Sequence, residues 1–161
     1  INDNHFNIYI ISVKGKRLQP AIKNAHKNLY PHYSPRGDAI VYFSRKHTKN
    51  IEDEIYAFNI ITRKEEHLTR WKQHDYCPYW SNNGNKIAYV TSEENNKPEI
   101  YIMKTNGEAK QRITFNNDVD TLPSWSPNDI NLLVTRYKNG SYQIYKIFLN
   151  EPLGTLREVS R

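Results

Sequence analysis

The feature that most constrains the fold is a segment that recurs along the chain at a nearly constant interval. Its clearest marker is a proline followed by any residue, an aromatic residue and a serine. This marker occupies residues 31–34, 78–81 and 123–126, so successive copies begin 47 and then 45 residues apart. A second marker, the dipeptide Ile-Tyr, begins at Ile8, Ile55, Ile100 and Ile144. Because both markers keep one order and one period, we interpret the chain as tandem copies of one structural unit.

Each unit is predicted to form four short β-strands. The first strand holds the proline marker and is followed by turn residues such as Gly37 and Gly84. The second strand is a continuous apolar run, as expected for a strand covered on both faces. The third strand centres on Ile-Tyr. The fourth ends at an apolar residue followed by a polar one, such as Leu68-Thr69. Four strands in a period of 44–47 residues are typical of a β-propeller blade.

A helix at residues 50–56 is the main alternative to this interpretation. Ile51 and Ile55 have the i, i+4 spacing of one helical face. However, Ile55-Tyr56 aligns with three Ile-Tyr pairs that have no helical context. We therefore expect a polar loop at residues 45–53 and a strand around Ile55.

Composition indicates a core built largely from aromatic rings. Only 37% of the residues are hydrophobic, whereas the chain holds 12 tyrosines and 3 tryptophans. Tyr33, Trp80 and Trp125 occupy the aromatic position of the three proline markers, where each ring can bury about 150–250 Å². We expect these rings to lie in the core rather than to stack on a ligand.

Several classes of protein and site are excluded by composition and charge. A single cysteine, Cys77, excludes an internal disulfide framework and a cysteine-based zinc site. No run approaches the 18 apolar residues of a membrane span, and the first residues show no signal-peptide pattern. The net charge is +6, but the charges do not cluster, and residues 63–67 carry both signs. Nucleic acid is therefore not a predicted partner.

The repeat resembles the PD40 repeat, also called the WD40-like β-propeller repeat, which forms the blades of TolB-like propellers. The clearest copy comprises residues 78–84, 87–89, 99–103 and 112–114. Three positions depart from the pattern: Tyr33 replaces tryptophan, Asn82 replaces proline, and Asp129 replaces the turn glycine. The resemblance implies an all-β fold, a partial β-propeller of about three and a half four-stranded antiparallel blades.

The predicted organisation is one propeller segment over residues 1–161. Residues 1–20 supply only the last two strands of a blade, and three complete blades follow at residues 22–69, 70–114 and 115–160. The chain does not supply the two inner strands that would complete the first blade. Preceding residues, a larger propeller or another chain would have to provide them, and we favour a fragment of a longer protein. Unpaired blade edges also predict self-association.

The loops that precede each proline marker are the predicted binding site, because in propellers such loops ring the central channel. Aligned on the proline, they carry acidic, amide and imidazole groups. The candidate partner-binding residues are His26, Asn28, His74, Asp75, Asp118 and Asp120. At the repeated position of Asn28, Asp75 and Asp120, turn capping is the favoured alternative role. No pair of these residues has the spacing of a metal-ligand motif, so no metal or other cofactor is predicted.

Catalysis is not predicted, because the chain has neither a G-x-S-x-G nor an H-E-x-x-H motif. The serines of the proline marker recur, whereas a catalytic nucleophile is needed once. The resemblance implies a non-catalytic module that binds a protein or another macromolecule in the bacterial periplasm or outside the cell. The best-known family member works there with peptidoglycan-associated lipoprotein. Two alternatives are the substrate-gating propeller of a prolyl-oligopeptidase-like peptidase and a carbohydrate-active propeller resembling oligogalacturonate lyases.

Overall fold

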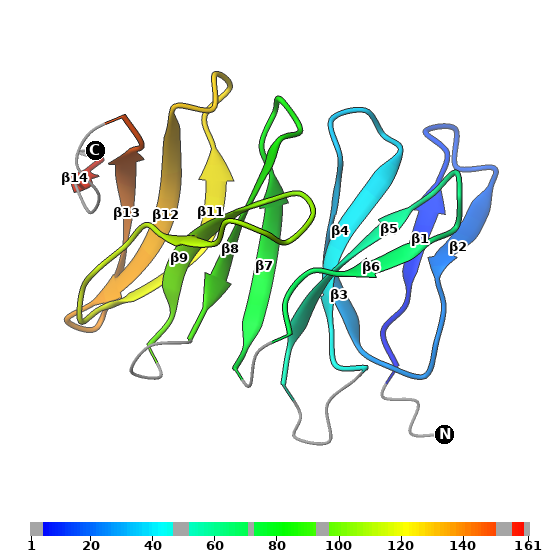
Figure 1. Ribbon diagram of the computed structural model, residues 1–161, viewed down its shortest axis with the longest axis horizontal. Helices are drawn as coiled ribbons and strands as arrows, with labels where there is room; N and C mark the ends of the chain where they lie inside the picture. Colours follow the sequence, from blue (N-terminus) through cyan, green and yellow to red (C-terminus); the bar gives the residue numbers. More distant parts are fainter. Residues whose placement is uncertain (1–4, 47–51, 71–72, 93–96, 151–155, 160–161) are drawn as a thin grey trace.

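The computed structural model describes residues 5–46, 52–70, 73–92, 97–150 and 156–159 (Figure 1). Within these ranges the chain forms antiparallel β-sheets and no helix. The first sheet has two strands, β1 (Ile8–Ile11) and β2 (Leu18–Ile22). Sheet I contains β3 (Asn28–Tyr33), β4 (Ala39–Ser44), β5 (Glu54–Asn59) and β6 (Glu65–His67). Sheet II contains β7 (Asp75–Trp80), β8 (Lys86–Thr91), β9 (Glu99–Lys104) and β10 (Gln111–Arg112). Sheet III contains β11 (Val119–Trp125), β12 (Asn131–Lys138), β13 (Ser141–Phe148) and β14 (Leu156–Glu158).

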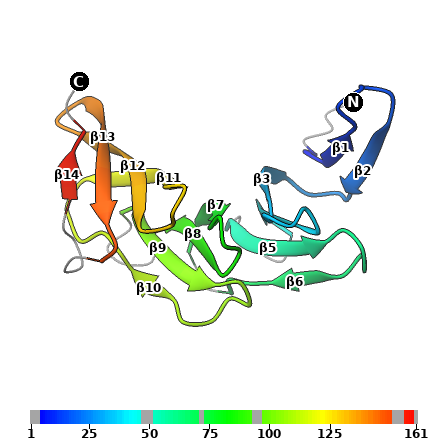
Figure 2. The ribbon, with the colours of Figure 1, turned by 90° about the horizontal axis from the view of Figure 1, so that it is seen from above.

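The sheets follow one another along an arc, and the first strands of sheets I to III lie on its concave side (Figure 2). Strands within each four-stranded sheet pair in sequence order, as expected for blades. Ile55 lies within β5, which begins at Glu54, so the strand prediction for the second Ile-Tyr pair is confirmed. Most of the expected polar loop at residues 45–53 lies outside the described residues.

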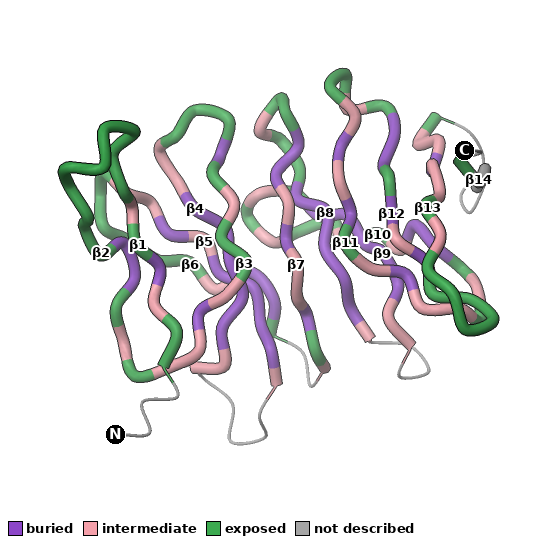
Figure 3. The backbone as a smooth tube through the Cα atoms, turned by 180° about the vertical axis from the view of Figure 1, so that it is seen from behind, coloured by how far each residue is buried: buried purple, intermediate pink, exposed green. Residues whose placement is uncertain are grey.

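The core lies between the sheets rather than within any one of them. Ile8 and Ile22 of the two-stranded sheet pack on Tyr42 and Tyr56 of sheet I. The next interface joins sheets I and II, and the third joins sheets II and III. Buried segments therefore occupy the middle of the arc, whereas the turns are exposed (Figure 3). Sheets I and II each bury their two faces against different neighbours, which explains their continuously apolar second strands.

We call β3, β7 and β11, the first strands of sheets I to III, the inner strands. Each of them contains a bulge at the proline marker. The pairing register shifts between Leu29 and His32 in β3, and equivalent shifts occur in β7 and β11. The residue before each proline has a positive φ: 51° at Tyr30, 50° at Cys77 and 52° at Leu122. Proline has no N–H to donate to the ladder, so the bulge places it where no such bond is required.

Two departures from the repeat pattern compensate for each other in the structure. Asp129 replaces the turn glycine, adopts a φ of 58°, and uses its carboxylate to bind the equivalent turn of sheet II. Its Oδ1 accepts the backbone N–H of Asn82 at 2.8 Å, and its Oδ2 accepts that of Asn83 at 2.7 Å. A proline at position 82, as the repeat prefers, could not donate the first of these bonds. The two substitutions together create a link between adjacent sheets.

Replacing Asp129 with glycine is expected to lower the free energy of unfolding by about 1–2 kcal/mol, because glycine keeps the turn but loses the three bonds that the carboxylate accepts from Asn82 and Asn83. Denaturant unfolding would measure this change. The partner substitution Asn82→Pro removes the two bonds that Asn82 donates to Asp129 and leaves the one from Asn83. The double variant should therefore cost less than the sum of the single variants, and strict additivity would contradict a direct link.

The three aromatic rings of the proline markers do not share one environment. Trp80 and Trp125 are each 7% exposed, as expected, but Tyr33 is 47% exposed. Trp80 packs against sheet I and Trp125 against sheet II. Tyr33 lies at the matching position of sheet I, where the preceding two-stranded sheet has no inner strands to cover it. The expected burial of Tyr33 is therefore wrong, because burial here depends on the preceding sheet.

Candidate functional site

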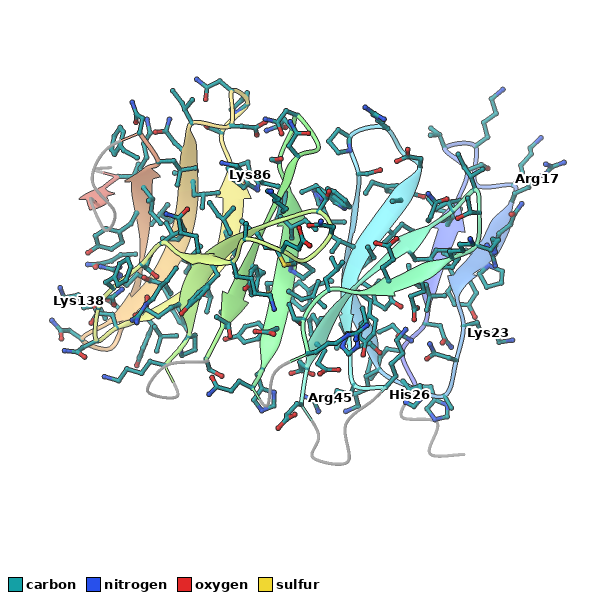
Figure 4. All side chains as sticks on the ribbon, in the orientation of Figure 1. Arg17, Lys23, His26, Arg45, Lys86 and Lys138 are labelled. Atoms are coloured by element: carbon teal, nitrogen blue, oxygen red, sulfur yellow. The ribbon has the colours of Figure 1, made fainter. Side chains whose placement is uncertain are left out.

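The candidate site is the edge of the arc formed by the segments that lead into the inner strands. We call residues 23–27, 73–74 and 115–118 the inter-sheet rim. His26 and Arg45 mark this lower edge in Figure 4, which also places Lys138 there. Three of the six predicted partner-binding residues, His26, His74 and Asp118, belong to the rim itself. The other three lie at the start of the inner strands: Asn28 and Asp75 are the first residues of β3 and β7, and Asp120 is the second residue of β11.

Asn28, Asp75 and Asp120 are buried and tie each inner strand to the preceding sheet. Their backbone N–H groups donate to carbonyl oxygens of Phe6, Asp53 and Pro98, at 2.9, 2.7 and 3.0 Å. Each carbonyl belongs to the residue two positions before an Ile-Tyr pair. The repeated position thus supplies the same contact between sheets three times, beneath the surface of the rim.

Asp120 has a charged partner, the Arg136 guanidinium. Its Oδ1 accepts from Arg136 Nε at 2.7 Å, and its Oδ2 accepts from Arg136 Nη2 at 2.8 Å. The amide Nδ2 of Asn116 also donates to Oδ2 at 2.7 Å. In sheet I, the matching cross-strand contact is Ser44 Oγ donating to Asn28 Oδ1 at 2.8 Å. The bidentate pair of Arg136 and Asp120 fixes the geometry of both side chains.

His74 combines exposure with a fixed position. Its side chain is 48% exposed, and its Nδ1 lies 3.2 Å from Asp53 Oδ2 and accepts the Asp53 backbone N–H at 3.3 Å. Arg45 holds the same carboxylate, with Nε 2.5 Å from Asp53 Oδ1. The contacts at Nδ1 orient the imidazole ring, while about half of the side chain stays exposed.

Asp118 and His26 occupy matching places in their loops. The backbone N–H of Asp118 donates to Asn116 Oδ1 at 2.7 Å, and that of His26 donates to Asn24 Oδ1 at 3.0 Å. The Asp118 carboxylate lies 3.8 Å from Lys138 Nζ and 3.9 Å from Arg136. Both side chains are partly exposed. Backbone and side-chain bonds thus hold these loops in one shape.

Sequence reasoning missed the polar residues that support the rim. Asn24 and Asn116 each stand four residues before the repeated position and bind it through their side chains. Glu99 is buried and accepts from Arg112 and Asn116. The equal spacing of Asn24 and Asn116 was a usable signal, whereas the role of Glu99 depends on residues 13 to 17 positions away.

The inner strands also line an apolar groove of about 260 Å³ on the concave side. Its wall is the three bulges, with Tyr30 and Leu122 each about half exposed. The rings of His32 and Tyr79 are 3.6 Å apart, and His32 Nδ1 accepts the Trp80 backbone N–H at 3.3 Å. Burial lowers the pKa of His32, which keeps the ring neutral and able to accept.

Cys77, in the same groove, is expected to be a slow thiol nucleophile. Burial, with a smaller contribution from the Asp53 carboxylate, raises its pKa to about 11. Compared with the ordinary value of 9.0, this lowers the thiolate fraction at pH 8 about a hundredfold. The rate of alkylation by iodoacetamide should still rise about tenfold per pH unit above pH 9. The unfolded chain in urea provides the control, and equal rates in both states would contradict the prediction.

In the described part of the chain, no three His, Cys, Asp or Glu side chains gather as a metal site would require. The described residues also contain no helix with the length and apolar character that crossing a membrane demands.

Comparison with known proteins identifies the family. The family model described as the TolB beta propeller domain, PD40, matches residues 1–160. The chain belongs to this family. The tandem sheets are therefore propeller blades, and the all-β prediction and the resemblance to TolB-like propellers are confirmed.

The relatives of this chain include a Tol-Pal system protein and an uncharacterized peptidase. The chain is 40% identical over 74 residues to the Tol-Pal system protein TolB of Ruthia magnifica, covering 45% of this chain and 17% of that protein. It is 29% identical over 110 residues to the uncharacterized peptidase YuxL of Bacillus subtilis, covering 65% of this chain and 16% of that protein. The chain thus spans about a sixth of the length of these relatives.

A solved structure matches the PD40 segment along most of its length. The putative TolB of Agrobacterium tumefaciens superposes with a TM-score of 0.82 at 19% sequence identity. This match covers 94% of the chain and 55% of the TolB chain. At this identity the likeness concerns the fold alone.

Proposed function

We propose that this PD40 segment is a non-catalytic module that binds a protein partner through its inter-sheet rim. The observation that carries the proposal is the contrast between a repeated, buried anchor and variable groups just before it. Asn28, Asp75 and Asp120 tie down the strands, while the neighbouring loops present His26, His74 and Asp118. A rigid scaffold with differing loops is the usual basis of recognition by such folds.

The rim offers a partner both charge and hydrogen bonds at fixed positions. The half-exposed His74 ring lies beside the Asp53 carboxylate, which also binds Arg45. Asp118 lies beside Lys138 at the far end of the same edge. These groups are ordered before binding, which reduces the entropy that association costs.

The nature of the partner is proposed from the relatives. TolB of Ruthia magnifica is a Tol-Pal system protein. By this likeness we propose a periplasmic or extracellular location and a protein partner of the peptidoglycan-associated lipoprotein kind. The peptidase relative supports the alternative of a substrate-gating propeller, which would use the same edge to admit substrates.

Replacing His74 with alanine is expected to weaken partner binding about tenfold or more, which is the loss of one well-placed contact. Calorimetric titration with the soluble domain of a peptidoglycan-associated lipoprotein would measure it, with Asp118→Ala as a second rim variant. Lys14→Ala, in the turn between β1 and β2 on the opposite edge, is the matched control. Equal affinity of all variants for the partner would show that the inter-sheet rim is not the binding site. Tight metal binding that His74→Ala abolishes would instead favour a carbohydrate-active propeller.

We also propose that the two end faces of the arc promote self-association. Tyr9 and Ile11 are exposed on the two-stranded sheet, although their equivalents Tyr56 and Phe58 are buried between sheets. At the other end of the arc, Ile144 is exposed, although the equivalent residues Ile55 and Ile100 are buried between sheets. Both faces present apolar surface that every internal sheet covers, and light scattering tests whether copies of the chain associate.

A further inference from the structure

The apolar groove on the concave side is built from the same three positions of successive repeats. We call it the concave groove, and residues 30–32, 77–79 and 122–124 line it. Each triplet consists of the residue with positive φ, the proline of the marker and the residue after that proline. The groove therefore crosses all three inner strands, with β7 between β3 and β11 (Figure 2). A molecule that contacts both of its ends has to be extended.

Two large apolar side chains of the concave groove are exposed, one at each end. Tyr30 of β3 is 56% exposed, and Leu122 of β11 is 49% exposed. The Tyr30 ring stacks on Phe43, with ring centroids 5.7 Å apart, so its position is fixed before any ligand arrives. Between these ends, the rings of His32 and Tyr79 lie 3.6 Å apart. Exposed apolar surface in a concave site is typical of a place where another molecule docks.

The concave groove offers no charge to a ligand at neutral pH. None of the described residues that line it is Asp, Glu, Lys or Arg. Burial lowers the pKa of His32 below its ordinary value of 6.5, and burial raises the pKa of Cys77 to about 11, so both side chains are neutral. A charged ligand would lose its hydration here without gaining a partner of opposite charge. The groove therefore favours an uncharged ligand.

The polar groups of the concave groove favour a ligand that accepts hydrogen bonds. The hydroxyl groups of Tyr30 and Ser124 make no hydrogen bond within the described part of the chain, so both remain free to donate. A proline-rich segment has carbonyl oxygens that accept, but its prolines have no N–H that would need a partner. In the polyproline II conformation such a segment is extended and makes no internal hydrogen bonds. It thus matches the length, the neutrality and the donors of the groove.

We propose that the concave groove binds a proline-rich segment of a partner protein in the polyproline II conformation, with its proline rings packed on Tyr30 and Leu122. Grooves lined by aromatic rings recognise such segments in other folds, because the segment is ordered before it binds and loses little entropy. The groove measures about 260 Å³, which is small for a drug-sized ligand and suits a few residues of an extended chain. The proposal does not rest on the function proposed for the inter-sheet rim.

Cys77, the single cysteine of the chain, lies in the concave groove and reports its occupancy. The probe is acetyl-hexaproline-amide, and acetyl-(Gly-Ser)₃-amide is the control peptide without proline. Calorimetric titration gives the dissociation constant of each peptide. Mass spectrometry then follows alkylation of Cys77 by iodoacetamide at about pH 9. We expect hexaproline at ten times its dissociation constant to slow alkylation about tenfold, because roughly a tenth of the groove stays free.

Three variants make the test specific to the concave groove. Tyr30→Ala and Leu122→Ala each alter a half-exposed side chain at one end of the groove and should weaken hexaproline binding about tenfold. Tyr33→Ala is the matched control, because Tyr33 is a similarly exposed tyrosine of β3 that does not line the groove. This control should leave the affinity unchanged, and thermal melts check that each variant is folded. His74→Ala in the rim should also leave it unchanged, which separates this proposal from that for the rim.

Four results would overturn the proposal. The first is hexaproline that neither binds nor slows alkylation of Cys77. The second is equal affinity for the proline and Gly-Ser peptides, which would show that proline is not recognised. The third is an equal loss of affinity in Tyr30→Ala and Tyr33→Ala, which would place the peptide elsewhere. The fourth is stronger protection of Cys77 by phenol than by hexaproline, which would identify a site for a free aromatic molecule.

Discussion

Replacing Asp120 with alanine is expected to lower the free energy of unfolding by about 3–5 kcal/mol, because it leaves the Arg136 charge buried without its partner. Both side chains are almost fully buried, and two hydrogen bonds of 2.7 and 2.8 Å join them. The loss also frees Asn116 Nδ2, which donates to the same carboxylate. Denaturant unfolding followed by circular dichroism would measure the change.

The neighbouring carboxylate supplies the control for this prediction. Asp118 lies 3.9 Å from Arg136 but is partly exposed, so Asp118→Asn should cost less than about 1 kcal/mol. Adding Arg136→Met to Asp120→Ala removes the stranded charge and should recover part of the stability. A small effect of Asp120→Ala, equal to that of Asp118→Asn, would show that the pair is solvated rather than buried.

Replacing Trp125 with alanine is expected to destabilise the fold by about 3–5 kcal/mol. The ring packs with Val90, Ile100 and Leu132 between sheets II and III, and its Nε1–H donates to the Tyr79 carbonyl oxygen. Truncation would open a cavity at the interface and remove that hydrogen bond. The melting temperature and the denaturant midpoint should both fall.

Tyr33 is the matched control, because it occupies the same place in the repeat but lies 47% exposed. Tyr33→Ala should cost about 1 kcal/mol or less, as expected for a surface substitution. A large cost at Tyr33 would mean that another surface covers this ring in solution. Similar small costs at both positions would contradict the packing described between sheets II and III.

The candidate rim was predictable in its position but not in its chemistry. Aligning the repeats located His26, His74 and Asp118 before the inner strands, because loop positions follow from strand order. The sequence could not show that Asp53 and Arg45 hold His74, since these residues lie 21 and 29 positions away across a sheet boundary. Nor could it show that Asp129 and Asn82, 47 residues apart, bind each other.

The amino-acid order alone determined the period, the four strands of each unit, the turns and the family. These properties depend on neighbours within a few residues: proline and glycine set local backbone angles, and continuous apolar runs mark covered strands. Only the tertiary structure decided that Trp125 is covered while Tyr33 is not, and that the Trp80 indole N–H finds no acceptor among the described residues. Burial and pairing at those sites depend on the adjacent sheet, whose contributing residues lie about one repeat away in the chain.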